Sequence, residues 1–187
     1  MTTRVRLDLF DVNRTFKRGR SRLFEAAWYI CKVFFFLSPW PWPSGFKGMI
    51  LRFFGAKVGQ GVVLRPKLNI NIPWRLEIGD YSWIGEDVYL LSLDKISIGS
   101  NCCISQRSFL CTGNHDYREE KFSFKGAPIT IGNGAWVGAA VFVGPGVVIG
   151  DEAVVTAGSV VLKSLPAGMV CSGNPALPRS TRWKESV

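Results

Sequence analysis

The most restrictive feature of the sequence is an aliphatic residue that returns every six positions over much of the chain. Helices repeat near 3.6 residues and strands at 2, so neither element alone explains this period. Four groups keep the spacing of six, separated by gaps of eight, eight and twenty-one residues. The positions are Val58, Leu64 and Ile70; Ile78, Ile84 and Leu90; Ile98, Ile104 and Leu110; and Ile131, Val137, Val143, Ile149, Val155 and Val161.

Three units of six residues fit one turn of a three-sided prism whose faces are short parallel strands. The fourth residue after an aliphatic is usually small, as the narrow interior of such a prism requires. A glycine follows the first aliphatic of each turn, where we expect the chain to bend sharply or to adopt positive φ. These glycines are Gly59, Gly79, Gly99, Gly132 and Gly150. We therefore predict an all-β solenoid over residues 58–166, in preference to a β-sandwich with evenly spaced strands.

The extra residues between the groups all follow the third unit of a turn. Two come after Ile70, two after Leu90 and fifteen after Leu110. All of them therefore leave the prism at the same edge. The longest insertion, within residues 112–129, is where a solenoid can carry a binding loop without interrupting its core.

Residues 1–57 form a basic, aromatic-rich segment for which we predict helical structure. The first 60 residues hold 11 Lys or Arg against three acidic residues, which accounts for +8 of the net charge of +9. Residues 23–37 are strongly apolar but contain Glu25 and Lys32 and are too short to span a bilayer. We expect a helix that docks on the body of the protein or lies at a membrane surface. Residues 167–187 are expected to be a C-terminal tail.

The five cysteines are odd in number and lack CxxC spacing, so neither a disulfide framework nor a zinc ribbon is predicted. A reducing cytoplasm is the simpler environment. No P-loop, dinucleotide fingerprint or nucleic-acid motif is present, and the basic segment by itself suits a membrane surface or a phosphate-bearing ligand.

The repeat IGNGAWVGAAVFVGPGVVIGDEAVVTAGSVV at 131–161, followed by GNP at 173–175, resembles the hexapeptide-repeat O-acetyltransferases. Four further segments are similar to the colanic-acid-type enzymes of exopolysaccharide synthesis. These are SPW at 38–40, LRFFGAKVG at 51–59, ISQRSFLCTGNHDY at 104–117 and PITIGNGAWVGA at 128–139. The resemblance implies a left-handed parallel β-helix, a homotrimer with active sites between subunits, and acetyl transfer from acetyl-CoA to a sugar hydroxyl.

A sugar hydroxyl attacks a thioester only if a positioned base removes its proton, and histidine suits this task near neutral pH. His115, in GNHDY of the long insertion, is the one histidine of the chain. It also lies where the resemblance places the catalytic base. Nearby Asn114 and Asp116 are candidates for binding the acceptor, as is Asp94 in the preceding insertion at the same edge.

The resemblance also implies a set of acetyl-CoA-binding residues. Small residues that let the backbone approach the pantetheine arm are Gly138, Ala139, Ala157 and Gly158, and cations for the nucleotide phosphates are Lys163 and Arg179. Backbone N–H groups near Gly138 and Ala139 are the expected donors to the oxyanion.

Three other functions compete with this prediction. The same prism occurs in zinc carbonic anhydrases, but their three-histidine site needs more than one histidine per chain, so we expect no metal. A different acceptor, such as a sugar nucleotide, serine or an antibiotic, is compatible with the same residues. A solenoid used only for binding would not need His115.

Overall fold

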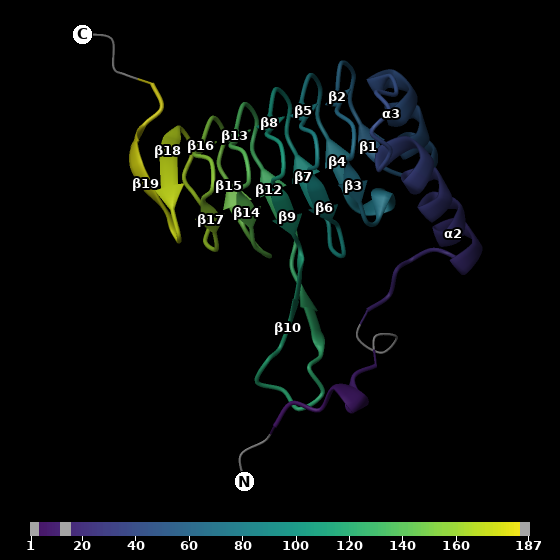
Figure 1. Cartoon of the computed structure of the whole chain (residues 1–187). Coiled ribbons are helices and arrows are strands. Elements are labelled where there is room, and N and C mark those ends of the chain that lie inside the picture. The colour runs from purple at the N-terminus through teal and green to yellow at the C-terminus, as the bar shows by residue number, and fades with distance from the viewer. Residues whose placement is uncertain (1–3, 12–15, 184–187) are drawn as a thin grey trace.

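The computed structural model describes residues 4–11 and 16–183, and its body is a parallel β-solenoid. Its strands form three sheets that face one another around a common core (Figure 1). The first sheet contains β1 (Lys57–Val58), β4 (Leu76–Ile78), β7 (Ile96–Ile98), β12 (Ile129–Ile131) and β15 (Val148–Ile149). The second contains β2 (Val63–Leu64), β5 (Trp83–Ile84), β8 (Cys103–Ile104), β13 (Trp136–Val137), β16 (Val154–Val155), β18 (Met169–Gly173) and β19 (Ala176–Thr181). The third contains β3 (Asn69–Ile70), β6 (Tyr89–Leu91), β9 (Phe109–Cys111), β14 (Phe142–Val143) and β17 (Val160–Val161).

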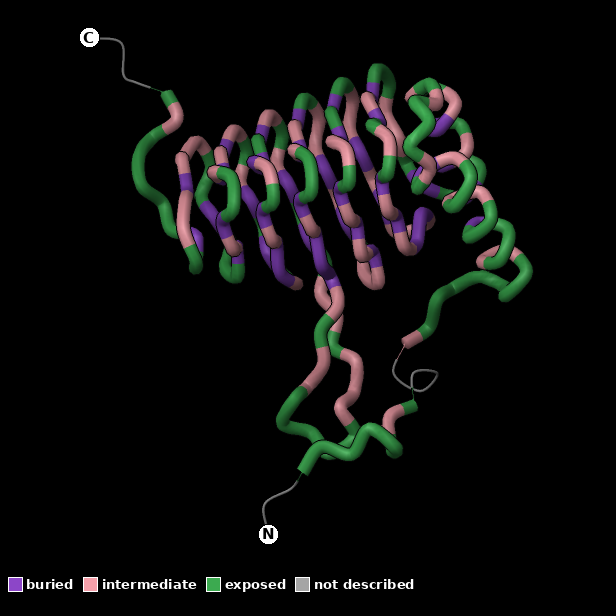
Figure 2. Tube along the Cα trace, viewed as in Figure 1, coloured by how far each residue is buried: buried purple, intermediate pink, exposed green. Residues whose placement is uncertain are grey.

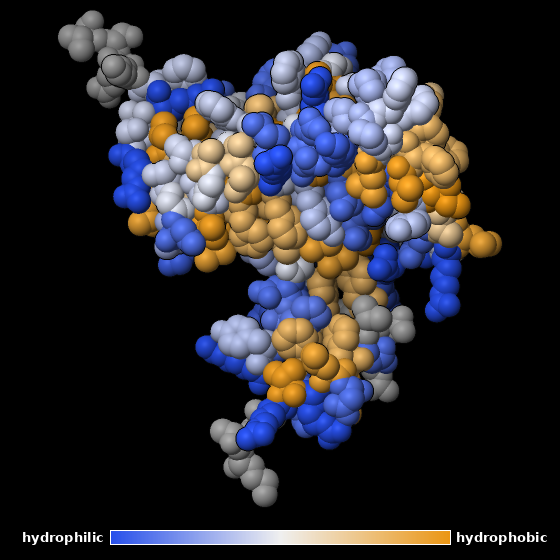
Figure 3. Space-filling view, viewed as in Figure 1, coloured by the Kyte–Doolittle hydropathy of each residue, from blue (hydrophilic) through white to orange (hydrophobic). Residues whose placement is uncertain are grey.

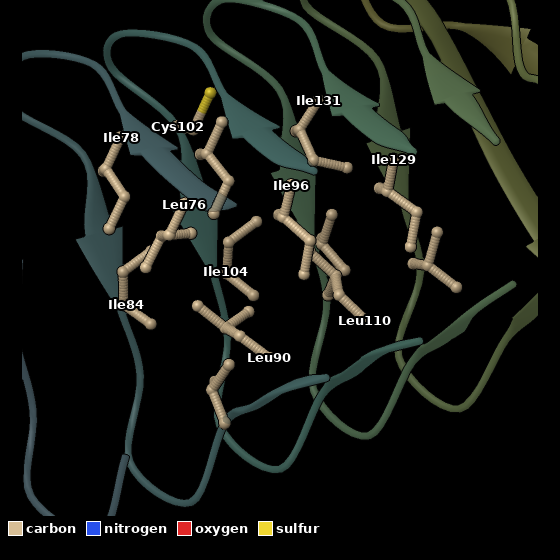
Figure 4. Close-up of a cluster of buried hydrophobic side chains, with 14 of the residues drawn as sticks. Leu76, Ile78, Ile84, Leu90, Ile96, Cys102, Ile104, Leu110, Ile129 and Ile131 are labelled. Atoms are coloured by element: carbon tan, nitrogen blue, oxygen red, sulfur yellow. The ribbon is translucent and has the colours of Figure 1, made fainter. Parts of the chain in front are cut away.

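The strand register confirms the six-residue period. Each periodic aliphatic stands opposite its equivalent in the next turn; Ile78, for example, pairs with Ile98, and Ile98 with Ile131. All of these side chains are buried except Val58, which is half-buried in the first turn. Figure 4 shows several of them converging on the interior of the prism. Burial of these side chains provides the main stabilisation of the coil.

The small residues at the fourth position are also buried, as predicted. They are Val62, Ser82, Val88, Cys102, Ser108, Ala135, Val141, Val147, Ala153 and Ser159. The buried hydroxyls are satisfied by the backbone of the next turn: Ser82 Oγ donates to the Gly99 carbonyl at 2.7 Å, and Ser108 Oγ to the Gly138 carbonyl at 2.7 Å.

The expectation of positive φ at the repeated glycines is wrong, because the left-handed residue comes two positions later. Tyr81 and Asn101 have φ of +56°, whereas Gly79 and Gly99 do not have positive φ. Glycine is needed at these positions because the next turn stacks closely on them. A Cβ at Gly79 would lie 2.6 Å from the carbonyl carbon of Gly99, closer than any side chain tolerates.

All three insertions leave the prism after a strand of the third sheet, as predicted. The first carries the short helix η3 (Pro73–Arg75), and the second is the bend after β6. The third is an antiparallel hairpin of β10 (Gly113–His115) and β11 (Phe124–Gly126), which projects away from the prism (Figures 1 and 2).

The N-terminal segment is helical, and its part from residue 22 to residue 53 covers the first turn of the prism (Figure 1). It contains η1 (Leu7–Leu9), α2 (Arg22–Cys31), the π-helical η2 (Lys32–Phe36) and α3 (Ser44–Phe53). Trp28 is buried, and its indole N–H donates to the carbonyls of Ile70 and Asn71 at 3.3 and 3.1 Å. The helix predicted over residues 23–37 therefore docks on the body. No helix in the described ranges is both long enough and apolar enough to cross a membrane.

Side chains of the helix α3 form hydrogen bonds with backbone groups at the open edge of the second sheet. Ser44 Oγ accepts from the N–H of Leu64 at 3.0 Å, and the buried Lys47 Nζ donates to the Arg65 carbonyl at 2.9 Å. At the other end, β18 pairs in parallel with β16, and β19 then turns back antiparallel. The coil thus continues beyond residue 166, where we expected a tail.

Candidate active site

The hairpin places His115 outside the prism on a two-stranded support. Gly113 pairs with Gly126, Asn114 with Lys125, and His115 with Phe124. The hairpin begins directly after β9, so the sheet fixes the position of its base. His115 therefore sits on regular backbone in the longest insertion, where the sequence predicted a functional loop.

The imidazole of His115 is oriented by a backbone carbonyl. Its Nδ1 lies 2.8 Å from the carbonyl oxygen of Phe122. Because a carbonyl only accepts hydrogen bonds, Nδ1 carries the proton and Nε2 of the neutral ring keeps its lone pair. This is the tautomer that a general base requires.

Three aromatic rings surround the imidazole. Phe122 stacks on it with ring centroids 4.3 Å apart and an interplanar angle of 7°. Phe10 and Phe124 approach it in edge geometry, at 5.3 and 6.1 Å. Phe122 also has φ of +50°, which is uncommon for a bulky residue and turns its carbonyl toward Nδ1.

Phe10 and Phe122 were missed by the sequence analysis. Phe10 lies more than one hundred positions from His115 in the chain, and no local motif connects them. In the arm formed by residues 4–11, Phe10 is the one residue that is not exposed. The arm also contacts the tip of the hairpin, where the N–H of Arg6 donates to the Glu120 carbonyl at 2.8 Å.

The predicted acceptor-binding residues do not all gather around His115. Asn114, His115 and Asp116 border one hollow of about 270 Å³, together with Tyr117, Arg118 and Lys125. Asn114 Oδ1 accepts from the His115 N–H at 2.8 Å, and Asp116 Oδ1 from the Arg118 N–H at 3.0 Å. Both side chains therefore also stabilise the hairpin.

Asp94 lies in a different and larger groove of about 940 Å³. This groove is bounded by Trp74, by the bend containing Asp94 and by Phe124 at the hairpin base. Asp94 Oδ1 accepts from the N–H of Lys95 at 2.6 Å. The groove and His115 share Phe124 as a neighbour, so Asp94 is near the hairpin without contacting the imidazole.

Most of the predicted acetyl-CoA-binding residues do converge. Gly138, Ala139 and Ala157 line a hollow of about 370 Å³ with Trp136 and Gln106. Gly158 is adjacent, and its N–H donates to the Ala139 carbonyl at 2.8 Å. A Cβ at Gly138 would lie 2.7 Å from the Ala157 nitrogen, so the coil itself requires glycine there.

The two backbone amides proposed to donate to the oxyanion differ in whether their N–H is already hydrogen-bonded. The N–H of Gly138 donates to the Val155 carbonyl at 2.8 Å and belongs to the ladder of the coil. The N–H of Ala139 has no hydrogen-bond partner in the part of the chain that the structure describes. Ala139 is therefore the better-placed donor.

The two predicted phosphate-binding cations lie at the end of the prism remote from α3. Lys163 is exposed and follows β17. Arg179 is on β19, where its Nε donates to Ser172 Oγ at 3.2 Å. Its guanidinium is thus already partly used within the C-terminal hairpin.

Three of the cysteine side chains are buried. Burial raises the pKa of the thiols of Cys102, Cys111 and Cys171, which disfavours a thiolate nucleophile. Residues 4–11 and 16–183 contain no group of three or more His, Cys, Asp or Glu side chains arranged to hold a metal ion.

Comparison with known proteins defines the class of this chain. Residues 128–163 match the family model for bacterial transferase hexapeptide repeats. The colanic acid biosynthesis acetyltransferase WcaF of Escherichia coli (strain K12) is 45% identical over 171 residues, covering 90% of this chain and 92% of the relative. The chain belongs to the hexapeptide-repeat acetyltransferases and is an acyltransferase.

A more distant relative agrees with this assignment, and solved structures share the fold. Nodulation protein L of Rhizobium leguminosarum is 35% identical over 132 residues, or 69% of each chain. A hexapeptide-repeat acetyltransferase from Vibrio cholerae superposes with a TM-score of 0.79 at 23% identity, covering 89% of this chain and 96% of that one. A galactoside acetyltransferase in complex with coenzyme A superposes with a TM-score of 0.77 at 24% identity, covering 86% of this chain and 81% of that one.

Proposed function

We propose that this enzyme transfers acetyl from acetyl-CoA to a sugar hydroxyl in exopolysaccharide or glycolipid-precursor biosynthesis, with His115 as the general base. The observation that carries the proposal is the Nδ1 contact to the Phe122 carbonyl, which leaves Nε2 free to accept a proton. The 45% identity to a colanic acid biosynthesis acetyltransferase supports the class of acceptor.

The proposed reaction assigns each group a step. Nε2 of His115 removes the hydroxyl proton as the sugar oxygen attacks the thioester carbonyl carbon. The N–H of Ala139 donates to the oxyanion of the tetrahedral intermediate. The carbon–sulfur bond then breaks, and the imidazolium returns its proton to the departing CoA thiolate. The products are the O-acetyl sugar and CoA.

The binding roles are proposed on the same basis. Gly138, Ala139, Ala157 and Gly158 would hold the pantetheine arm, since the first three line a hollow and carry no long side chain, and Gly158 is adjacent to it. Lys163 and Arg179 would contact the nucleotide phosphates, and Asn114, Asp116 and Asp94 the acceptor. We further propose that the enzyme is a cytoplasmic homotrimer that associates peripherally with a membrane.

The first prediction concerns His115→Ala. Loss of the base should lower kcat by about 10²- to 10⁴-fold, because general-base catalysis contributes that much. Affinity for acetyl-CoA and the melting temperature should stay near those of the unmodified enzyme. The measurement is CoA release with a panel of saccharide acceptors, combined with titration calorimetry of CoA.

The matched control is Lys121→Ala, a change to an exposed residue of the same hairpin, which should leave kcat unchanged. Full activity of His115→Ala would contradict the proposed base. A panel containing sugar nucleotides, serine and an antibiotic tests the acceptor class separately. If the enzyme acetylates one of those compounds in preference to the saccharides of the panel, the proposed acceptor class is wrong and the assignment as an acyltransferase still holds.

A further inference from the structure

The helical segment formed by α2 and η2 is apolar on two faces, and the body of the protein covers only one of them. Trp28 and Phe36 point inward and are 3% and 0% exposed. On the outside, Leu23, Ile30 and Phe34 are 85%, 57% and 64% exposed. A helix on the surface of a globular protein ordinarily carries polar residues on its outer face.

The exposed apolar residues extend beyond α2 and η2. We define the apolar stripe as Leu23, Tyr29, Ile30, Val33, Phe34, Leu37 and Trp40, each at least 36% exposed. Figure 3 shows hydrophobic surface over this part of the molecule. A continuous apolar patch of this kind marks an interaction surface.

Cationic side chains border the stripe. Arg18, Arg20 and Arg22 precede it and are exposed. A hollow of about 640 Å³ is lined by Arg18, Arg22 and Lys32 together with Tyr29 and Ile30 of the stripe.

The cations of this hollow outnumber its acids. Glu25 is the single carboxylate among its lining residues and pairs with Arg18 at 3.7 Å. Arg22 and Lys32 form no ion pair with a carboxylate in the described ranges, so they leave an excess of positive charge beside the stripe.

We propose that the apolar stripe docks on the surface of a bilayer that contains anionic phospholipid. The side chains of the stripe enter the boundary between headgroups and acyl chains, while the bordering arginines and Lys32 contact lipid phosphates. The charge favours this occupant over a second copy that docks through the same stripe about a two-fold axis, because the two stripes would bring like charges together. The helix lies along the surface because its opposite face is fixed to the prism by Trp28.

The experiment is co-sedimentation of the full-length protein with vesicles of phosphatidylcholine, with and without phosphatidylglycerol. Binding should require phosphatidylglycerol and weaken as salt increases, because the lipid contacts of the cations are screened. The double variant Ile30→Glu/Phe34→Glu should bind at least about 10-fold more weakly, since it places carboxylates in the stripe. Both residues are exposed, so its melting temperature should match the unmodified protein.

The control variant Leu162→Glu/Leu177→Glu changes two residues of similar exposure, 56% and 49%, at the other end of the prism. It should bind vesicles like the unmodified protein. Absence of binding, binding independent of phosphatidylglycerol, or equal binding by the stripe variant would overturn the proposal. A stripe variant that lowers the molar mass in solution without any vesicle binding by the parent protein would assign the stripe to a protein interface. None of these results depends on acetyl transfer, so they are separable from a failure of the proposed function.

Discussion

His115 is held by a backbone carbonyl and three aromatic rings. The carbonyl belongs to Phe122, and the geometry depends on the left-handed backbone of that residue. Phe10 completes the enclosure from a segment far away in the chain. The orientation of the base therefore depends on the N-terminal arm as well as on the hairpin.

Phe10→Ala should lower kcat about 2- to 10-fold, since an aromatic edge contact contributes roughly 0.5–1.5 kcal/mol. The KM for acetyl-CoA should not change, because Phe10 does not line the hollow with Gly138 and Ala157. Steady-state kinetics with a saturating acceptor measure the effect. Phe10→Tyr should restore most of the rate by retaining the ring, and a Phe10→Ala enzyme with unchanged kcat would rule out this positioning role.

Lys47 is a second residue whose environment produces a measurable effect. It is fully buried on the inner face of α3, and burial, with a smaller contribution from Arg65, lowers its pKa from 10.5 to about 8. Between these values the unfolded chain binds a proton that the folded protein does not bind. Stability should therefore rise with pH from about 8 to 10.5, by up to about 3 kcal/mol from this residue.

The test compares urea unfolding of the unmodified protein and Lys47→Met across this pH range. The difference between their free energies of unfolding isolates Lys47 from the other groups that titrate there. The unmodified protein should gain stability relative to Lys47→Met as pH rises. Parallel pH dependences would show that Lys47 does not titrate in this way.

At the scale of the element, the turns of the coil are stabilised by close stacking. The glycine after the first aliphatic of each turn lets the next turn approach, as at Gly79. Small inward residues such as Ala153 leave room for the larger aliphatics of the neighbouring faces. The elements are short, so most of their stability comes from packing between turns.

Gly79→Ala should lower the free energy of unfolding by about 1–3 kcal/mol, because the added methyl group would overlap the backbone of the next turn. Gly45→Ala is the matched control: it lies in α3, where a Cβ would meet nothing within 4 Å. It should be neutral or stabilise by up to about 1 kcal/mol through helix propensity. Chemical denaturation measures both, and a neutral Gly79→Ala would contradict the stacking explanation.

At the scale of the whole molecule, the prism has a helical cap at one end and the antiparallel pair β18 and β19 at the other. The projecting hairpin of β10 and β11, which carries His115, and the hollow near Ala139 are separate features of one chain. A homotrimer would allow the hairpin of one subunit to complete the hollow of its neighbour.

Light scattering of the purified protein should give about 62 kDa, three times the chain mass of 20.8 kDa. The physical reason is that the proposed active site needs both His115 and the hollow near Ala139, and the hollows at these two places share no lining residue within one subunit. If the enzyme remains active when it is diluted to assay concentrations, its molar mass should also remain that of a trimer. A fully active protein of monomer mass would contradict the trimer.

The sequence alone predicted the coil, because a period of six fits neither a helix nor a strand and is explained when equivalent side chains stack in successive turns. It also located the insertions at one edge and assigned the one histidine to the longest of them. In contrast, positive φ was expected at the wrong positions, because the glycines are required by the approach of the next turn, which is a property of the stacked coil.

The tertiary structure alone decided how His115 is oriented and which face of the apolar helix is covered. Phe10 meets His115 only after the N-terminal arm folds along the hairpin, and a contact between such distant residues has no signature in local spacing. Residues 23–37 are strongly apolar in the sequence, and only docking through Trp28 distinguishes the buried face from the exposed stripe. Periodic packing is a local property that repeats along a chain, whereas the environment of a site depends on which distant segments meet there.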